Sequence, residues 1–314
     1  MEYVQLIIGL AILILSGESL VKGSVSMAIK MRVSTLVIGM TIVSFGTSAP
    51  ELLVAIKAAL KDKPDIAIGA IVGSNVSNIA LILGLTAIVF PIRVNRDSIA
   101  IDWPMMIIAT GLFYACIFNG ILGFWEGAIL FSALLIFGTW LIWRSRKKKK
   151  IEDVESGQTY SRTHPISYLK DLAFIALGCL GLIYGADLFL EGASELALNF
   201  GISERIIGLT LVALGTSLPE LITSLVAAFR HQADIGIGNL IGSNIFNLLA
   251  ILGITAMVKE IPINYDIIHF DFYWMLAVSL IIFPMMLIRF KITRLEGFLL
   301  LAFYVIYIHF VLIS

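Results

Sequence analysis

The chain has few charged residues. Of its 314 residues, 14% are Asp, Glu, Lys or Arg and 59% are hydrophobic. Average soluble proteins carry about 25% charged residues, so this composition excludes an ordinary cytosolic enzyme and a disordered chain. A net charge of zero, with no basic face spread along the sequence, also excludes a nucleic-acid binder. What remains is a protein whose surface faces lipid.

Cysteine and recognisable enzyme motifs are also scarce. The two cysteines, Cys116 and Cys179, lie in apolar segments, where inert buried side chains are expected rather than a disulfide or a metal site. The sequence contains no HExxH, no GxSxG and no P-loop. We therefore predict that the protein is not an enzyme and has no cofactor, with an intramembrane enzyme as a remote alternative.

Long apolar segments, by contrast, recur throughout the chain. Each has about 20 residues, enough for a helix to cross a hydrocarbon core of roughly 30 Å. The first begins after Glu2 without a basic region, which favours a retained helix over a cleaved signal peptide. We predict an all-α polytopic membrane protein with ten transmembrane helices. The ten segments are 3–21, 34–58, 67–90, 103–119, 122–143, 170–190, 204–229, 235–258, 272–289 and 294–312.

The distribution of basic residues predicts the orientation. Most of the 22 Lys and Arg residues fall in loops on one side of the predicted membrane, and many are in the linker 144–168. That side is expected to be cytoplasmic, because cytoplasmic loops are enriched in Lys and Arg. Both termini then lie outside the cytoplasm. The linker is interpreted as a topogenic segment that contacts anionic lipid.

The sequence matches itself when it is shifted by 169 residues. Residues 39–87 align without gaps to residues 208–256, and about half of the aligned positions are identical. The chain therefore divides into a first half, 1–143, the linker 144–168 and a second half, 169–314. Each half has five predicted spans, so the two halves have opposite orientations in the membrane. Such an inverted repeat is typical of secondary transporters, whose substrate site lies near the midplane.

Two short motifs carry the highest identity. Gly-Thr-Ser-x-Pro-Glu ends at Glu51 and again at Glu220, and Gly-Ser-Asn-x-x-Asn ends at Asn78 and again at Asn247. An unpaired carboxylate within a membrane costs several kcal/mol. No Lys, Arg or His lies in the central part of any span, so a mobile cation is the expected counter-charge.

The residues around the two glutamates provide further oxygen atoms. Pro50 and Pro219 should break their helices and free backbone carbonyls. Thr47 and Ser48 precede Glu51 by four and three residues, so both hydroxyls flank its carboxylate on one helical face. Carboxylate, hydroxyl, amide and carbonyl oxygens suit Ca²⁺ or Na⁺ rather than zinc or copper.

Other polar or small residues favour structural roles. The pairs Gly69/Gly73 and Gly238/Gly242 are expected to pack helices. Asp65 and Asp234 are expected to be helix N-caps. Glu18 and Asp187 lie near the ends of spans, where an interfacial or pathway-lining role is favoured over direct ion binding.

With these motifs the sequence resembles the cation/Ca²⁺ exchanger (CaCA) superfamily and, more narrowly, its prokaryotic Na⁺/Ca²⁺ exchangers. The resemblance covers both halves and implies that the first and sixth helices slide across a four-helix ion core. It implies that Glu51 and Glu220 bind Ca²⁺, that Asn78 and Asn247 line the centre, and that the remaining ligands are Thr47, Thr216, Ser48, Ser217, Ser74, Ser243 and the carbonyls of Ser44 and Ala213.

The sequence departs from some relatives at one position: Asn247 stands where relatives that include K⁺-dependent exchangers carry Asp. Asn there weakens the case for K⁺ co-transport. We predict exchange of Na⁺ for Ca²⁺ by a chain that works as a monomer in the cell membrane. An H⁺/Ca²⁺ antiporter is the main alternative, and a cation channel is a weaker one because a channel does not need an inverted repeat.

Overall fold

The polytopic helical class predicted from the sequence is confirmed. The computed structural model describes residues 2–155, 165–200 and 215–313. Within these ranges eight helices are long and apolar enough to cross a membrane, and the bent pair Thr35–Thr47 and Ala49–Leu60 makes a ninth. The predicted span 204–229 begins outside the described residues, and its remainder is the shorter apolar helix Leu218–Phe229. The count of ten therefore stays a prediction.

The first half contains eight α-helical segments, because π-helical turns and one break divide its spans. The α-helices are α1 (Glu2–Met31), α2 (Thr35–Ile38), α3 (Ser44–Thr47), α4 (Ala49–Leu60), α5 (Pro64–Val76), α6 (Gly84–Val89), α7 (Trp103–Ile117) and α8 (Phe124–Glu155). The π-helical turns are η1 (Gly39–Val43), η2 (Ser77–Leu83) and η3 (Ser98–Asp102). Such turns inside α-helices are frequent at functional sites.

The second half repeats this pattern wherever it is described. Its α-helices are α9 (Pro165–Asn199), α12 (Leu218–Phe229), α13 (Ala233–Phe246), α14 (Leu252–Val258), α15 (Phe272–Leu287) and α16 (Arg294–Ile313). Its π-helical turns, η5 (Asn247–Ile251) and η6 (Ile267–Asp271), fall at the positions that correspond to η2 and η3. The strands of the molecule are β1 (Ile92–Arg93), β2 (Ile121–Leu122), β3 (Ile261–Pro262) and β4 (Lys291–Ile292).

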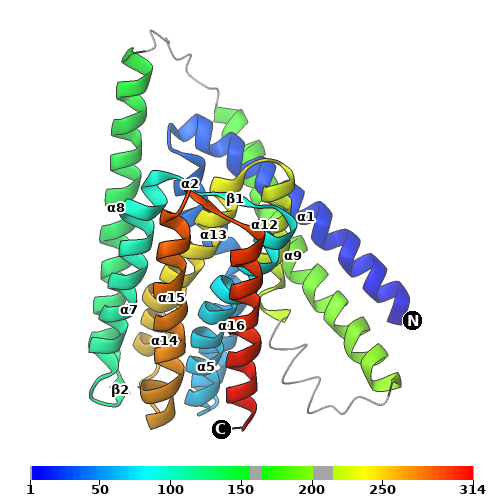
Figure 1. Cartoon of the computed structure of the whole chain (residues 1–314), viewed down its shortest axis with the longest axis vertical. Coiled ribbons are helices and arrows are strands. Elements are labelled where there is room, and N and C mark those ends of the chain that lie inside the picture. The colour runs from blue at the N-terminus through cyan, green and yellow to red at the C-terminus, as the bar shows by residue number, and fades with distance from the viewer. Residues whose placement is uncertain (1, 156–164, 201–214, 314) are drawn as a thin grey trace.

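The long helices α1 and α9 lie side by side and run diagonally past the other helices (Figure 1). Small residues allow their backbones to approach closely. A Cβ atom on Gly9 would lie 2.7 Å from the backbone nitrogen of Phe189, and one on Gly178 would lie 2.7 Å from the backbone nitrogen of Leu20. The numbering rises along one helix as it falls along the other, so the pair is antiparallel.

The two halves exchange their last helices. Helix α8 of the first half packs on α14 of the second, and α16 of the second half packs on α6 of the first. Both contacts depend on glycine: a Cβ on Gly127 would lie 2.5 Å from the carbonyl oxygen of Gly253, and one on Gly297 would lie 2.7 Å from that of Gly84. The strands follow the same rule, because β1 pairs with β4 and β2 pairs with β3, both antiparallel.

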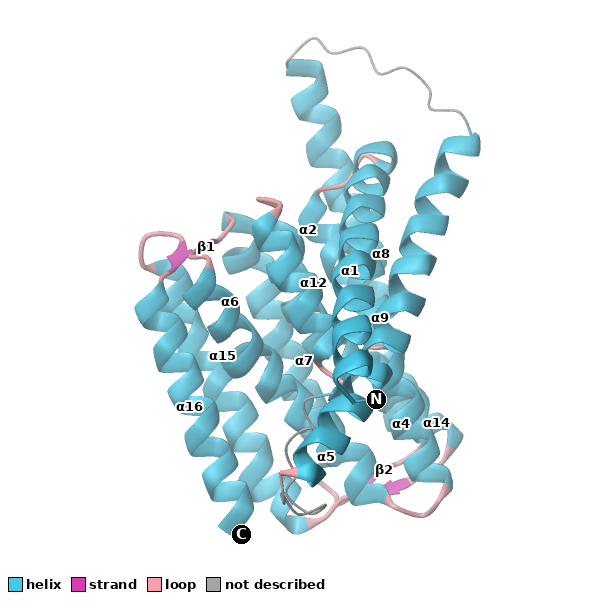
Figure 2. Ribbon diagram, turned by 90° about the vertical axis from the view of Figure 1, so that its right-hand side faces the viewer, coloured by secondary structure: helices cyan, strands magenta, loops and turns pink. Residues whose placement is uncertain are grey.

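These two strand pairs lie at opposite ends of the molecule (Figure 2). The labels N and C lie towards the end that holds β2, whereas the end of α8 and the start of α9 lie towards the end that holds β1 (Figures 1 and 2). The two termini and the linker are therefore on opposite sides of the helical body, as the sequence predicts for an odd number of spans in each half. Which side is cytoplasmic stays a prediction.

The basic linker differs from the loop expected over 144–168. Helix α8 continues to Glu155, and α9 begins at Pro165. Ser145 accepts a hydrogen bond from the backbone N–H of Ser34 at 2.9 Å, and Lys148 pairs with Asp97 at 2.8 Å. The first part of the linker is thus a helix that contacts the corner between α1 and α2 and the segment before α7. Sequence reasoning missed it because charged residues at a helix end resemble a loop.

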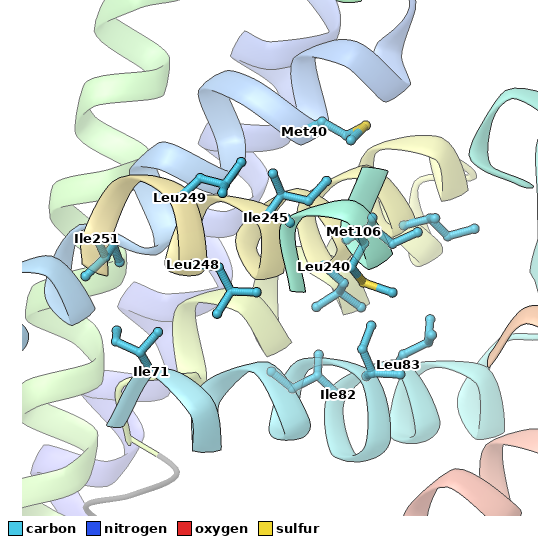
Figure 3. Close-up of a cluster of buried hydrophobic side chains, with 14 of the residues drawn as sticks. Met40, Ile71, Ile82, Leu83, Met106, Leu240, Ile245, Leu248, Leu249 and Ile251 are labelled. Carbon is cyan, nitrogen blue, oxygen red and sulfur yellow. The ribbon is translucent and has the colours of Figure 1, made fainter. Parts of the chain in front are cut away.

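An apolar core joins the two halves at the centre. Figure 3 shows side chains from α5, η2 and α7 of the first half facing side chains from α13 and η5 of the second. Buried residues make up 72% and 78% of the 18-residue apolar stretches of Pro64–Val89 and Ala233–Val258, against 17% for Arg294–Val311. The two spans with the Gly-Ser-Asn-x-x-Asn motif are thus far more enclosed by protein than the last helix. The labelled core residues are Met40, Ile71, Ile82, Leu83, Met106, Leu240, Ile245, Leu248, Leu249 and Ile251.

Candidate functional site: a buried carboxylate pair

The polar residues predicted from the duplicated motifs are buried in the same central region. Among the predicted site residues, only Thr216 is half-buried and Ala213 lies outside the described residues. Because these polar groups are hidden from solvent, each needs an internal partner or a bound ligand. The buried predicted residues are Ser44, Thr47, Ser48, Glu51, Ser74, Asn78, Ser217, Glu220, Ser243 and Asn247.

The prolines interrupt the helices as predicted. Helix α3 ends at Thr47, Ser48 has φ −88° and ψ 8°, and α4 then begins with Pro50 in its first turn. The two parts of this span meet at an angle of 47°. Ser217 repeats the conformation, with φ −92° and ψ 1°, directly before α12. The same local sequence therefore gives the same break in both halves.

This break places each glutamate in the first turn of a new helix. Glu51 is in the first turn of α4, and Glu220 is in the first turn of α12. Unpaired backbone N–H groups and the positive end of the helix dipole favour negative charge at this position. Sequence reasoning placed both glutamates within a span and missed this support. The signal was present, because proline is common in the first turn of a helix.

Hydroxyl groups surround the Glu220 carboxylate. The Ser48 hydroxyl donates to Glu220 Oε1 at 3.1 Å and lies 3.1 Å from the Ser243 hydroxyl. The hydroxyls of Thr47 and Ser243 also interact with this carboxylate. All three hydroxyl groups thus come from motifs predicted to bind ions, and two of them, Thr47 and Ser48, belong to the other half of the chain. Glu220 Oε2 has no hydrogen-bond partner among the described residues.

Glu51 has a barer environment. Its side chain is 1% exposed, and neither carboxylate oxygen has a hydrogen-bond partner among the described residues. Ser48, three residues before Glu51, donates to Glu220, so both carboxylates belong to one polar cluster. The ion pairs found in the described part of the chain involve neither residue. Two buried carboxylates in one cluster without a basic partner require protons or a bound cation.

Four asparagines connect the two halves beside the carboxylates. Asn75 Nδ2 donates to the carbonyl of Asn244 at 3.2 Å, and Asn244 Nδ2 donates to the carbonyl of Asn75 at 3.1 Å. Asn78 Nδ2 donates to Asn244 Oδ1 and Asn247 Nδ2 donates to Asn75 Oδ1, each at 3.0 Å. Every bond has a symmetric counterpart in the other half, so a two-fold axis relates the two motifs.

This network leaves oxygen atoms available at the predicted centre. The amide nitrogens of Asn78 and Asn247 are used by the partner asparagines, whereas the Oδ1 atoms of both lack a partner among the described residues. The unused atoms are acceptors, which are what a cation binds. Asn75 and Asn244 were not predicted as site residues, although their duplication marked them as clearly as Asn78 and Asn247.

Two further predicted ligands have internal partners. The Ser74 hydroxyl accepts a bond from Asn247 Nδ2 at 3.3 Å. The Ser44 carbonyl accepts the backbone N–H of Ser48 at 2.9 Å and the hydroxyl of Thr47 at 3.4 Å. The Ser217 hydroxyl is buried and has no partner in the described part of the chain. These atoms lie in the correct region, and their role as ligands stays a prediction.

The acidic residues outside the motifs have separate surroundings. The predicted N-caps are wrong: Lys63 and Gln232 are the N-cap residues of α5 and α13, and Asp65 and Asp234 lie inside the first turn, where they still face the positive end of the dipole. Each helix begins earlier than predicted, with its N-cap two residues before the aspartate. Glu18 pairs with Arg230 at the surface, and Asp187 is exposed, so neither reaches the buried carboxylates.

The glycine predictions differ between the halves. A Cβ on Gly238 would lie 2.6 Å from the carbonyl of Leu36, and one on Gly242 would lie 2.5 Å from Met40 Cα, so this pair packs helices as predicted. A Cβ on Gly69 would meet no described atom within 4 Å. The packing role of the first pair is therefore not seen among the described residues. Cys116 and Cys179 are both free thiols, the first buried and the second half-buried.

Comparison with known proteins identifies the family. The family model described as sodium/calcium exchanger protein matches residues 1–143 and 170–313. The chain belongs to the sodium/calcium exchanger family. It is 34% identical to a putative antiporter CaxA of Alkalimonas amylolytica, over 96% of this chain and 95% of that protein. It is 30% identical to the sodium/calcium exchanger MaX1 of Methanosarcina acetivorans, over 98% and 97% of the two chains.

Solved structures agree with this assignment. The sodium-calcium exchanger NCX_Mj, soaked with 10 mM Na⁺ and no Ca²⁺, superposes with a TM-score of 0.81 at 31% identity, over 98% of both chains. The predicted resemblance to the CaCA superfamily is therefore confirmed, as are the classes of membrane transport and antiport. Members of this family are cation/Ca²⁺ exchangers rather than enzymes, which fits the prediction at that level.

Proposed function

We propose that this protein exchanges Na⁺ for Ca²⁺ across a cell membrane and normally exports Ca²⁺. One observation carries the proposal: Glu51 and Glu220 are both buried, are linked through Ser48, and have no basic partner among the described residues. The pair has a charge of −2 when ionised, which one Ca²⁺ or two Na⁺ would neutralise. An empty pair is costly to carry through a closed gate, so transport should require an ion in both directions.

In this proposal the ligands are those predicted from the duplicated motifs. Glu51 and Glu220 bind Ca²⁺ together, and the amide oxygens of Asn78 and Asn247 line the centre. Their burial and their unpartnered oxygen atoms support this arrangement. Thr47 and Thr216 contribute to the Ca²⁺ site. The flanking Na⁺ sites are completed by Ser48, Ser217, Ser74, Ser243 and the carbonyls of Ser44 and Ala213.

The architecture in this proposal is an inverted repeat of ten transmembrane helices. The exchange of α8 and α16 between the halves and the symmetric asparagine bonds support the two-fold relation. Access to the site alternates between the two sides of the membrane as α1 and α9 slide together across the four-helix ion core. Both termini are placed outside the cytoplasm, the linker 144–168 inside it, and the monomer is the working unit. An additional Na⁺ moved inward with each Ca²⁺ exported would contribute about 2.3 kcal/mol per 100 mV.

The abundance of hydroxyl ligands favours Na⁺ over protons as the coupling ion. Hydroxyl and carbonyl oxygens around the carboxylates add neutral ligands that a dehydrated Na⁺ needs and a proton does not. Ser48 and Ser243 provide two such oxygens beside Glu220. The similarity to MaX1, a sodium/calcium exchanger, supports the same choice.

Ion fluxes in liposomes test the proposal. Purified protein is reconstituted in Na⁺-loaded vesicles, which are diluted into Na⁺-free buffer that contains ⁴⁵Ca²⁺. We expect uptake from Na⁺-loaded vesicles, none from K⁺-loaded vesicles, and none with Glu51→Gln. Uptake that ignores Na⁺ and follows an imposed pH gradient would overturn Na⁺ coupling and assign the protein to proton-coupled exchange.

A further inference from the structure

A buried asparagine beside the carboxylate pair breaks the symmetry of the site. Asn239 of α13 is 0% exposed, and the residue that corresponds to it in the first half is Ala70. Most polar residues near the centre occur in both halves, as the four asparagines of the inter-half network show. Asn239 therefore provides one half of the site with a group that the other half lacks.

Asn239 contacts the first half at two points. Its Oδ1 atom accepts a hydrogen bond from the Thr47 hydroxyl at 3.1 Å, and its backbone carbonyl accepts one from the Ser44 hydroxyl at 3.1 Å. Helix α13 comes this close because Gly238 and Gly242 leave room for the backbone of α2 and η1. The amide is consequently held against the end of α3, one residue before the break at Ser48.

The choice of acceptor decides what the Thr47 oxygen can do. A threonine hydroxyl has one proton to donate and two lone pairs that can bind a cation. Besides Asn239, Thr47 has the Ser44 carbonyl at 3.4 Å and the Glu220 carboxylate as possible acceptors. A hydroxyl that donates to Glu220 occupies a carboxylate lone pair and directs its proton towards the ion site. A hydroxyl that donates to Asn239 directs its lone pairs towards that site.

We propose that Asn239 is a positioning residue that fixes the Thr47 hydroxyl as a cation ligand. This inference rests on the proposed function, and the ligand is a dehydrated Ca²⁺ or Na⁺ ion. The side chain of Ala70 has no acceptor to offer Thr216, so the two threonines of the repeat are not equivalent. Thr47 is oriented before the ion arrives, whereas Thr216 receives no such help from the corresponding position.

Substitution at Asn239 and Thr47 tests this role by Ca²⁺ binding. Isothermal titration of the purified full chain gives the Kd of Ca²⁺ for each variant. We expect Asn239→Ala to raise Kd about tenfold, which corresponds to about 1.4 kcal/mol. Asn239→Asp retains an acceptor oxygen, so this variant should bind Ca²⁺ clearly more tightly than the Ala variant. In the double variant with Thr47→Ala, the two effects should not add, because they remove one shared interaction.

Thermal melting separates positioning from a structural role. Thr110→Val is the control, because Thr110 is buried and donates to Met106 within its own helix at 2.8 Å. Thr110→Val should lower Tm without changing the Kd of Ca²⁺. Asn239→Ala should raise that Kd even if it lowers Tm by no more than Thr110→Val does. An unchanged Kd in Asn239→Ala, or additive effects with Thr47→Ala, would overturn the inference. Wild-type protein that binds no Ca²⁺ would instead overturn the proposed function.

Discussion

The two halves share a motif but give their glutamates different surroundings. Glu220 receives a hydrogen bond from Ser48 and has three hydroxyl groups around it, whereas Glu51 has no partner among the described residues. The local sequence is nearly the same at both positions, so the difference arises from what the opposite half presents. A duplicated sequence therefore specifies two similar ligand sets without making them identical in one conformation.

This contrast is what an alternating carrier requires. If the halves exchange roles, the surroundings of Glu51 in one state become those of Glu220 in the other. The asparagine network is already symmetric and can serve as the fixed centre. The hydroxyl groups are not symmetric, and in the proposed mechanism they belong to the part that changes. The predictions below compare matched positions in the two halves, beginning with the largest expected effect.

Neutralising either glutamate should abolish exchange. Glu51→Gln and Glu220→Gln each remove half of the charge that holds Ca²⁺, so ⁴⁵Ca²⁺ uptake into Na⁺-loaded liposomes should fall to the level of empty vesicles. Their effects on the ion-free protein should differ, because Glu51 is an uncompensated buried carboxylate and Glu220 is hydrogen-bonded. We expect Glu51→Gln to raise Tm more than Glu220→Gln does. A larger gain from Glu220→Gln would contradict the comparison.

Adding one methyl group should distinguish the two glycine pairs. Gly242→Ala would force a Cβ to within 2.5 Å of Met40 Cα, which requires α13 to move away from η1. We expect a loss of about 1–3 kcal/mol, the usual range for overpacking, seen as a lower Tm and poor expression. Gly69→Ala meets no described atom within 4 Å and gains helix propensity of up to about 1 kcal/mol. Equal losses at both positions would show that the glycines are packed alike.

The asparagine network should respond equally in both halves. Asn75→Ala and Asn244→Ala each leave buried amide groups unpaired, and each should cost about 1–3 kcal/mol. The double variant should cost less than the sum, because the two residues bond to each other. Denaturation in detergent followed by tryptophan fluorescence measures all three variants. Unequal losses from the two single variants would argue against a symmetric centre.

The smallest difference is expected at the paired serines. Ser48→Ala removes the bond to Glu220 and should lower the stability of the ion-free protein by about 1 kcal/mol. Ser217→Ala removes a hydroxyl that has no partner among the described residues, so its effect should be close to zero. The comparison uses Tm of both proteins in Na⁺-free and Ca²⁺-free buffer. A greater loss from Ser217→Ala would reverse the assignment of the two environments.

Much of the fold could be predicted because the bilayer restricts what a helix can be. The length of the apolar segments indicated the spans, and the prolines indicated the breaks that the structure shows at Ser48 and Ser217. The repeat indicated which residues belong together, since a duplicated polar group in lipid is expensive to keep without a role. Helix N-caps were harder to predict, because a helix start that moves by two residues changes which residue is the N-cap, as at Asp65 and Asp234.

Other features depend on contacts between distant segments and could not be read from one sequence. The helical start of the linker is held by contacts with Ser34 and Asp97 that lie far away in the chain. Asn239 occupies a position where the repeat differs, so a search for identity passed over it. Its relevance follows only from its hydrogen bond to Thr47. Differences between repeats deserve the same inspection as identities when a site is sought.

The central claim is that Glu51 and Glu220 together bind an ion that must be replaced before the carrier returns. Vesicles loaded with ²²Na⁺ test it directly when efflux is measured with and without Ca²⁺ or Na⁺ outside. We predict rapid ²²Na⁺ efflux only when an external cation is present, and none at all for Glu220→Gln. Efflux of ²²Na⁺ from wild-type vesicles into cation-free buffer at the same rate would contradict obligatory exchange and indicate a channel.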